Sequence, residues 1–320
     1  MQFKNFSFKT SDGCELWVNR WSPDEGQEIK AIIQLHHGLA EHTLRYDRFG
    51  NILAENGYVL NAYDMRGHGR TGEIAVKNNT GLMGKLAEKD GFQRVVSDLK
   101  EMIDFDKKEF PDKPVILFGH SFGSFISQAF IEQFGNDINS CILCGTTGPR
   151  NFLINTSKPL VSLISAIKGK NTVVPLLDKL AFGSYNQRFK NSKSKNAWLS
   201  KNEMNVSNYE MDNWCGIPLT SSFFKDMMCG LKYIHNSKNI KKIPTNLPVF
   251  FIYGSDDPVG SYGKTIEKLA GIYKKNGMEN VSVKSYAGLR HEILNEIECE
   301  EVEKDVLSWL ENTLTTNSKS

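Results

Sequence analysis

The stretch Val115-Ile116-Leu117-Phe118-Gly119-His120-Ser121-Phe122-Gly123-Ser124 decides the fold. Its first four residues form the short apolar run of a buried strand, and a helical pattern follows from Ser124 to Phe134. Between them, Gly119 to Gly123 matches G-x-S-x-G. Roughly one chain in ten of this length contains that pattern by chance, but the strand and helix around it make it far more specific. In such a turn a serine Oγ is exposed at the carboxyl end of a sheet, whereas the alternative, a solvent-exposed loop serine, has no need of this setting.

Strands and helices alternate on both sides of this turn. Short, almost wholly apolar strands separated by helices indicate a parallel sheet that is covered on both faces. After an opening hairpin (6–10 and 15–21), we expect strands at 31–35, 58–63, 115–118, 140–144, 249–253 and 281–286, and helices at 46–56, 90–107, 124–134, 264–276 and around Val302, Val306, Trp309 and Leu310.

The alternation stops at about Pro149. From there to about Lys242, short amphipathic pieces alternate with polar segments such as residues 190–196. We therefore expect one sheet domain, residues 1–148 and 243–320, interrupted by a mostly helical insertion, residues 149–242. The tail from Thr315 to Ser320 is expected to be disordered.

Composition narrows the class of protein. The 320 residues include 39 basic and 37 acidic side chains, a net charge of +2. The chain therefore lacks the excess of positive charge that would neutralise the phosphates of a nucleic acid. Hydrophobic residues make up 40% of the chain, which is enough for a substantial core. Residues 1–7 lack the apolar run of a signal peptide, and no run approaches the length of a membrane span.

The six cysteines show no disulfide-framework spacing. Cys141 and Cys144 form a C-x-x-C, but they lie within the expected strand 140–144. Positions i and i+3 of a strand face opposite ways, so these two thiols cannot share a metal or readily pair. We therefore expect core packing, reduced thiols and a cytoplasmic location.

A serine hydroxyl needs a base to remove its proton, and in this setting the acid and then the histidine follow the serine along the chain. Only His235 and His291 follow Ser121. His235 lies at the end of the insertion, where a packing or surface role is expected. His291 lies just past the strand 281–286, in a loop that can cross the carboxyl edge of the sheet. We expect His291 to be the base.

The acid should follow the preceding strand, 249–253, where Asp256 and Asp257 both stand. A carboxylate is needed to fix the imidazole tautomer and to stabilise the imidazolium. Spacing alone does not separate the two. We prefer Asp257 and expect Asp256 to hydrogen-bond with the backbone of the turn.

The developing oxyanion needs fixed donors, usually the N–H after the nucleophile and one from the loop after an earlier strand. Phe122 supplies the first and Leu39, in the loop after the strand 31–35, the second. Histidines 36, 37 and 42 surround this loop, but no carboxylate–histidine spacing of a metal site accompanies them. We expect structural hydrogen bonds from them, and neither a metal nor a cofactor.

Residues Gly67 to Gly72 satisfy G-x-G-x-x-G and follow a strand. A dinucleotide site also requires a helix that the third glycine opens. Residues 73–81 show no helical stripe, so we expect a loop here and no nucleotide site.

With these residues in place, the chain resembles the monoacylglycerol lipase and lysophospholipase group of α/β hydrolases, which also contains serine aminopeptidase-like members. The resemblance spans roughly residues 10–312. It implies a mostly parallel eight-stranded sheet with helices on both faces, a helical cap, and a triad of Ser121, Asp257 and His291. It supports Asp257, because the acid of the group stands three places after a glycine. Phe122 replaces a frequent methionine and Leu39 is larger than usual, but both act through backbone N–H groups. The motifs that carry the resemblance are His37–His42 with Arg45-Tyr46, Asp64–Gly69, Gly119–Gly123, Gly254–Asp257 and Arg290–Glu292.

The insertion resembles the caps of this group only loosely. In such hydrolases the cap covers the catalytic edge, so its apolar residues would line an acyl pocket. Leu163 and Ile164, from a helical stripe that also holds Leu160 and Ile167, and Phe223 and Phe224 are the candidates. The alternative is that these residues only pack the cap onto the core.

These patterns predict a serine hydrolase that cleaves carboxylic esters with an apolar acyl chain, with a monoacylglycerol or lysophospholipid as the natural substrate. The expected partners are a small ester or lipid and, transiently, a membrane or micelle through the cap. The alternatives are amide or peptide cleavage, as in the aminopeptidase-like relatives, and a non-catalytic ligand-binding protein.

Overall fold

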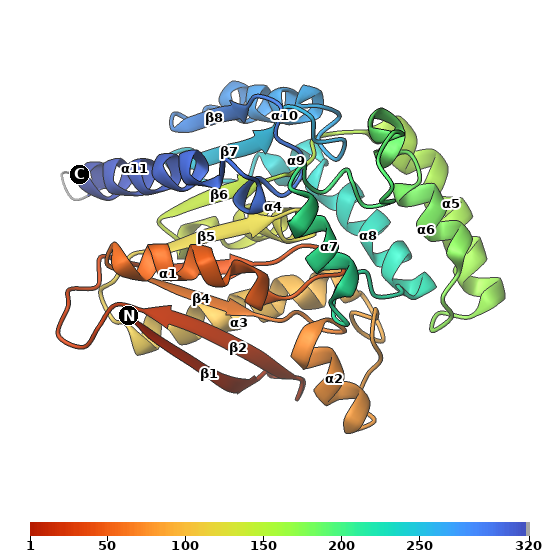
Figure 1. The fold of residues 1–320 in the computed structure, drawn as a ribbon, viewed down its shortest axis with the longest axis horizontal. Helices are drawn as coiled ribbons and strands as arrows, with labels where there is room; N and C mark the ends of the chain where they lie inside the picture. The colour runs from red at the N-terminus through yellow and green to blue at the C-terminus, as the bar shows by residue number, and fades with distance from the viewer. Residues whose placement is uncertain (318–320) are drawn as a thin grey trace.

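Eight strands form one mostly parallel sheet (Figure 1). The structure, a computed structural model, describes residues 1–317, with the side chains of 151–154, 316 and 317 left aside. Strand order is β1-β2-β4-β3-β5-β6-β7-β8, and only β2 runs against its neighbours. This confirms the expected sheet and its opening hairpin. The strands are β1 (Gln2–Lys9), β2 (Glu15–Ser22), β3 (Ala31–His36), β4 (Tyr58–Tyr63), β5 (Val115–His120), β6 (Ser140–Cys144), β7 (Val249–Gly254) and β8 (Val281–Tyr286).

Helices cover both faces of the sheet because each central strand is apolar on both sides. One buried cluster joins the sheet to α1 (Asp47–Glu55) and α11 (Cys299–Asn317). The other joins it to α3 (Gly91–Glu109), α4 (Phe122–Phe134) and α10 (Lys264–Lys275). Cys141 belongs to the second cluster and Cys144 to the first, so the two thiols do face opposite ways.

The insertion between β6 and β7 is helical. Its helices are α5 (Asn151–Lys168), α6 (Pro175–Phe182), α7 (Glu203–Met211), α8 (Ser221–Ile234) and α9 (Ser237–Ile240). Helices α5 to α8 gather beyond the carboxyl ends of the parallel strands (Figure 1). Helix α8 packs on both α5 and α4, and its first turn is capped by Thr220, whose hydroxyl accepts from the Phe223 N–H.

Two expectations about local structure were wrong. Residues Gly69–Lys77 form a helix, α2, and not a loop. Its buried face consists of Gly69, Thr71 and Gly72, so it leaves no apolar stripe in the sequence. Helix α11 reaches Asn317, so 315–317 are helical, while the rest of the expected disordered tail, 318–320, lies outside the described residues.

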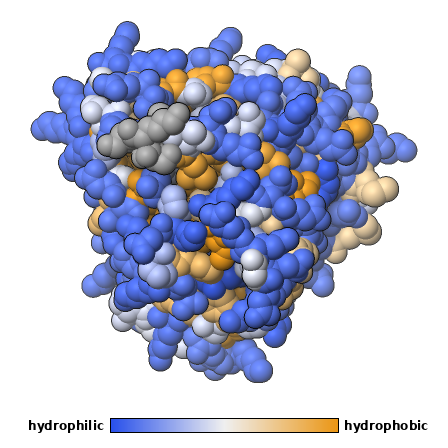
Figure 2. Space-filling model, turned by 90° about the vertical axis from the view of Figure 1, so that its left-hand side faces the viewer, coloured by the Kyte–Doolittle hydropathy of each residue, from blue (hydrophilic) through white to orange (hydrophobic). Residues whose placement is uncertain are grey.

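Surface character differs around the molecule. The face away from the insertion, where the chain ends, is mostly hydrophilic with scattered apolar spots (Figure 2). Within the part of the chain that is described, no helix is long and apolar enough to cross a bilayer.

Candidate active site

Ser121 stands in a strained turn between β5 and α4. Its φ is 52° and its ψ is −121°, a conformation that L residues rarely adopt and that costs about 1–3 kcal/mol. A Cβ on Gly123 would lie 2.0 Å from the carbonyl oxygen of His36, and one on Gly119 would lie 2.3 Å from Ser127 Oγ. The chain can therefore make this turn only with glycine at both positions, as the elbow pattern implies.

His291 and Asp257 form a buried pair. Nδ1 of His291 lies 3.0 Å from Oδ2 of Asp257, whose Oδ1 accepts from the Val259 N–H at 2.8 Å. Asp256 is partly exposed instead: its carboxylate lies 3.9 Å from Arg188, and its backbone N–H, not its carboxylate, makes the hydrogen bond with the backbone, to the Leu289 carbonyl. The structure thus brings Asp257, and not Asp256, to the imidazole.

The surroundings of His291 favour its charged form. Burial alone lowers the pKa of His291, but the charge and hydrogen bond of Asp257, with the charges of Glu292 and Glu41, raise that pKa above its usual value. Nε2 of His291 has no hydrogen-bond partner among the described residues. It therefore remains available to a hydroxyl.

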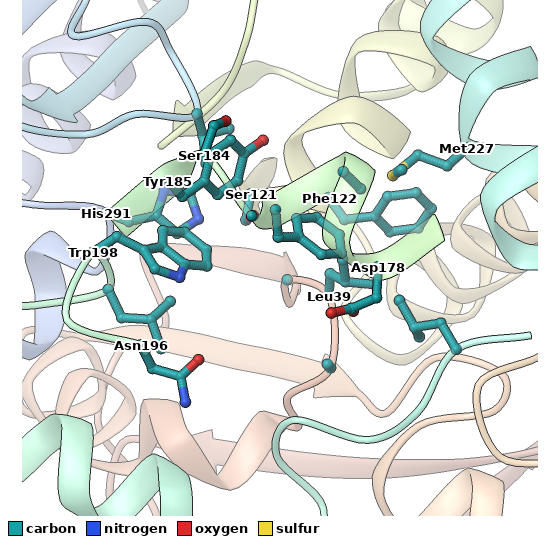
Figure 3. Close-up of a pocket in the computed structure, with 18 of the residues that line it drawn as sticks. Leu39, Ser121, Phe122, Asp178, Ser184, Tyr185, Asn196, Trp198, Met227 and His291 are labelled. Carbon is teal, nitrogen blue, oxygen red and sulfur yellow. The ribbon is translucent and has the colours of Figure 1, made fainter. Parts of the chain in front are cut away.

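Ser121 and His291 line the same cavity (Figure 3). The ring of His120, the residue before the nucleophile, lies 4.9 Å from the ring of His291. Burial and the nearby charge of His291 lower the pKa of His120 to about 4, so His120 is neutral at pH 7. The geometry therefore places a hydroxyl, an imidazole and a carboxylate at one edge of the sheet.

The loop after β3 lies against the nucleophile. A Cβ on Gly38 would be 3.0 Å from the Cβ of Ser121. The Gly38 N–H donates to Oε1 of Glu41 at 2.6 Å and is thereby occupied. The next residue, Leu39, and Phe122 both line the cavity. These are the positions that the sequence assigns to the two oxyanion donors.

The cavity has a volume of about 1220 Å³ and extends from Ser121 under the insertion. Tyr185 and Trp198 lie on its His291 side, and Phe122 and Met227 lie on the other (Figure 3). The Trp198 ring is 5.0 Å from the His291 ring. The side of the cavity near the base thus carries Tyr185 and Trp198, whose rings bear polar groups, and the other side carries the wholly apolar Phe122 and Met227.

Of the four expected pocket residues, only Phe224 lines this cavity. Leu163 is 57% exposed, because the buried face of α5 carries Val161 and Ser165 instead. Ile164 packs against the core cluster, and Phe223, fully buried, lies 5.2 Å from the Phe122 ring.

Other residues that line the cavity were not predicted from the sequence. His235 lines it, with Nε2 3.4 Å from the Thr147 carbonyl, so the expected packing role is only part of its place. Tyr185 and Trp198 stand in segments without hydrophobic periodicity, and no sequence signal marks them.

His36 and His37 are held by backbone groups. His36 Nδ1 lies 3.1 Å from the His37 carbonyl oxygen, and His37 Nδ1 lies 2.7 Å from that of Gly38. The Met65 N–H donates to His37 Nε2 at 2.9 Å. Burial lowers the pKa of both imidazoles to about 3, so both are neutral structural groups.

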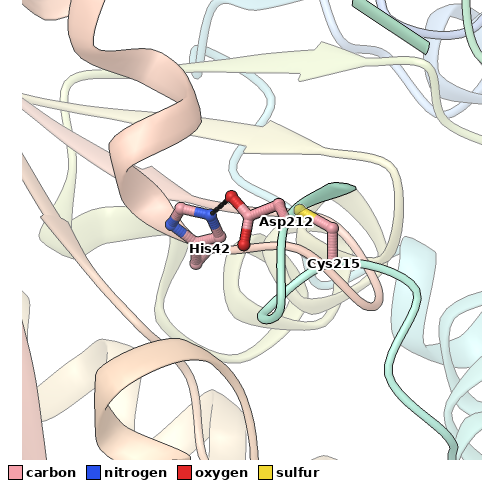
Figure 4. A group of neighbouring side chains, drawn as sticks. All are labelled: His42, Asp212 and Cys215. Atoms are coloured by element: carbon pink, nitrogen blue, oxygen red, sulfur yellow. Dashed lines mark hydrogen bonds and ion pairs between the residues drawn. The ribbon is translucent and has the colours of Figure 1, made fainter. Parts of the chain in front are cut away.

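His42, Asp212 and Cys215 form a cluster whose ligand-type atoms lie within 4.8 Å of one another (Figure 4). Nε2 of His42 pairs with Oδ2 of Asp212 at 2.8 Å. A metal-bound imidazole normally donates its other N–H to an acceptor, but Nδ1 of His42 has no partner in the described structure. The Arg45 charge also acts on Asp212 and Cys215. These features favour a hydrogen bond that joins the insertion to the loop after β3.

The G-x-G-x-x-G segment also has a structural role. The Asp64 carboxylate accepts from the Arg70 N–H at 2.7 Å, at the start of α2. That carboxylate stands where a dinucleotide phosphate would bind, so the helix found here does not restore a nucleotide site.

Comparison with known proteins identifies the family of this chain. The family model described as serine aminopeptidase, S33, matches residues 27–298. This chain belongs to that family. It is an α/β hydrolase of the monoacylglycerol lipase group, whose members are carboxylic ester hydrolases.

Among the relatives of this hydrolase, the monoacylglycerol lipase of Mycolicibacterium smegmatis is 25% identical over 312 residues, 95% of each chain. The monoglyceride lipase of Mus musculus is 24% identical, covering 95% of this chain and 89% of the relative. The structure of a carboxyl esterase from Bacillus coagulans in complex with glycerol superposes with a TM-score of 0.87 at 25% identity, over 98% of this chain and 99% of that one.

Proposed function

We propose that this hydrolase cleaves carboxylic esters with one apolar acyl chain, by acyl transfer through Ser121, His291 and Asp257. The observation that carries the proposal is the 3.0 Å contact between His291 Nδ1 and Asp257, beside a strained serine on the floor of a cavity. A strained nucleophile next to an oriented base is the arrangement that acyl transfer needs.

In the proposed first step, Nε2 of His291 takes the proton of Ser121 while Oγ attacks the ester carbonyl. The N–H groups of Leu39 and Phe122 donate to the oxyanion. The carbon–oxygen bond of the ester then breaks, and His291 gives the proton to the leaving alcohol. Water repeats the sequence on the acyl-serine and releases the acid. Asp257 keeps the proton on Nδ1 throughout, and the steps need no metal or cofactor.

Monoacylglycerols and lysophospholipids are the proposed substrates. Each has one acyl chain, and the cavity is lined by many apolar side chains, among them Val161, Leu177, Phe182, Phe224, Met227 and Leu231. The names of the M. smegmatis and mouse relatives support a monoacylglycerol, and the glycerol in the B. coagulans complex supports a glycerol leaving group.

We propose that residues 149–242 are a cap that also contacts a membrane or micelle. Leu160, Leu163 and Ile167 of α5 are 48%, 57% and 71% exposed, and Leu176 and Leu180 of α6 are 54% and 57% exposed. Such an apolar surface is unusual for a monomer, and the opposite face is mostly hydrophilic (Figure 2). Leu163→Asp should lower activity on micellar esters but not on dissolved ones, and equal loss on both would refute the contact.

The six cysteines are all free, which supports a reducing compartment and hence a cytoplasmic location.

Labelling by a fluorophosphonate tests the mechanism. The wild type should be labelled, and Ser121→Ala should not. A panel of esters and aminoacyl amides, varied in chain length and leaving group, then tests the substrate class. Faster cleavage of amides than of matched esters would favour the peptidase alternative, and an unlabelled wild type would favour a binding protein.

A further inference from the structure

A buried arginine joins three segments that are far apart in the sequence. Arg45, in the loop after β3, has a side chain only 9% exposed. Its guanidinium holds both oxygens of Glu292, at 2.6 and 2.7 Å, and also donates to Oε2 of Glu41 at 2.9 Å. Two-pronged contacts of this kind fix direction as well as distance.

Helix α7 of the insertion completes the arrangement. The Asn205 amide donates to Oε2 of Glu292 at 2.6 Å, and its oxygen accepts from Arg45 at 3.1 Å. The Tyr209 ring lies 5.0 Å from the Arg45 guanidinium, and its hydroxyl donates to the Ala40 carbonyl at 3.1 Å. Two turns of α7 therefore meet Arg45, one through a hydrogen bond of Asn205 and the next through the ring of Tyr209.

The two carboxylates that Arg45 holds adjoin two different parts of the candidate active site. Glu292 directly follows His291, the proposed base. Glu41 accepts from the N–H of Gly38, the residue before Leu39, and from the Tyr46 hydroxyl at 2.8 Å. A shift of the guanidinium would therefore displace both the loop that carries His291 and the loop that carries Leu39.

We propose that Arg45, Glu292 and Asn205 form a positioning unit through which docking of α7 sets the geometry of the oxyanion loop and the histidine loop. This inference rests on the proposed function. None of the three residues is assigned to the reacting atoms; they act through Leu39 and His291.

A role in stability alone does not account for this unit. The free energy needed to desolvate three charged groups often exceeds the free energy that their mutual attraction contributes. Apolar residues of similar size therefore often stabilise a fold better. One guanidinium also faces two carboxylates, which leaves a surplus negative charge near His291. The charge of Glu292 is among the causes that raise the pKa of His291.

The first test is Asn205→Ala, which removes the hydrogen bonds of Asn205 to Arg45 and Glu292, leaves the Arg45–Glu292 pair intact, and keeps the contacts of Tyr209. Asn208→Ala, at an exposed position of the same helix, is the matched control. On a short dissolved ester we expect kcat to fall about 10-fold or more in Asn205→Ala, with KM and melting temperature close to those of the control. The rate of fluorophosphonate labelling should fall in parallel.

The second test is Glu292→Gln, which keeps the shape of the side chain but removes its charge. The charges of Asp257, Glu292 and Glu41 act on His291, the neutral His120 lies beside it, and Arg45 pairs with Glu292, so loss of the Glu292 charge should lower the pKa of His291. The acidic limb of the pH profile of kcat/KM should therefore move to lower pH. A structural role alone would leave this limb where it is.

Two results would overturn the positioning unit: labelling and kcat of Asn205→Ala equal to those of Asn208→Ala, or an unmoved acidic limb in Glu292→Gln. Both presuppose a wild type that is labelled at Ser121. An unlabelled wild type would instead refute the proposed function, so the two failures are distinguishable.

Discussion

Gly123→Ala is the substitution whose effect follows most directly from the geometry of the elbow. The added Cβ would lie 2.0 Å from the His36 carbonyl oxygen and 2.5 Å from that of His37. Such atoms do not approach within 3.0 Å, and both neighbours are backbone, so α4 and β3 must separate by about 1 Å.

That movement has two expected costs. Overpacking of a core typically costs about 1–3 kcal/mol, and with rigid backbone on the receiving side we expect the upper end, about 3 kcal/mol of unfolding free energy. The displaced segment is also two residues from Leu39, and a misplacement of about 1 Å in catalytic geometry can lower the rate about 100-fold. We therefore expect both stability and kcat/KM to fall.

Urea unfolding and hydrolysis of a dissolved ester measure the two effects. Gly271→Ala is the matched control, because its Cβ would meet nothing within 4 Å in the middle of α10. That control should gain about 0.5–1 kcal/mol, from helix propensity alone. A Gly123→Ala enzyme with wild-type midpoint and wild-type kcat/KM would refute the account of the elbow.

Two further substitutions probe buried carboxyl groups. Asp257→Asn should lower kcat roughly 10⁴-fold, because an amide can neither hold the Nδ1–H tautomer nor stabilise the imidazolium, while Asp256→Asn stays near wild type; comparable losses in both would remove Asp257 from its role. Glu132 has neither carboxylate oxygen hydrogen-bonded in the described structure, and burial raises its pKa to about 10 from 4.5. The folded state therefore binds the proton more tightly, so this group favours folding below pH 4.5 and progressively opposes it as the pH rises towards 10. Glu132→Gln should raise the unfolding free energy by more than about 1 kcal/mol at pH 8 and hardly at all at pH 4, and an equal effect at both pH values would contradict this.

Most strands of this protein could be predicted from sequence because five of them, β3 to β7, are buried throughout and consist mainly of apolar residues. Helix α2 could not, because the side it buries is made of Gly69, Thr71 and Gly72. Close packing there uses small residues, with Thr71 Oγ1 accepting from the Trp17 N–H at 2.8 Å. Hydrophobic periodicity reports apolar burial only, so a helix packed through small and polar groups leaves no such signal.

The candidate triad could be predicted because each member follows a strand that was recognisable. The residues that the insertion contributes to the site could not be predicted in this way. Trp198 reaches His291 because residues 198 and 199 run beside the histidine loop: the His291 N–H donates to the Trp198 carbonyl at 3.4 Å and the Glu292 N–H to that of Leu199 at 2.7 Å. Backbone pairing between segments 90 residues apart depends on tertiary docking. The orientation of Leu163 likewise depends on which face of α5 meets α8.

The insertion contacts the sheet domain in two chemically different ways, and this has a consequence for the proposed specificity. On the side of α7, hydrogen bonds of Asn205, Tyr209 and Asp212 fix its direction against the loop after β3. On the side of α8, apolar packing such as Phe223 on Phe122 holds it, and such packing tolerates repacking at constant volume. Substitutions in α5, α6 and α8 should therefore reshape the proposed acyl wall while the polar side keeps the loops of Leu39 and His291 in place. Exchanging Met227 for another apolar residue of similar size should accordingly change chain-length preference without changing the rate of labelling at Ser121.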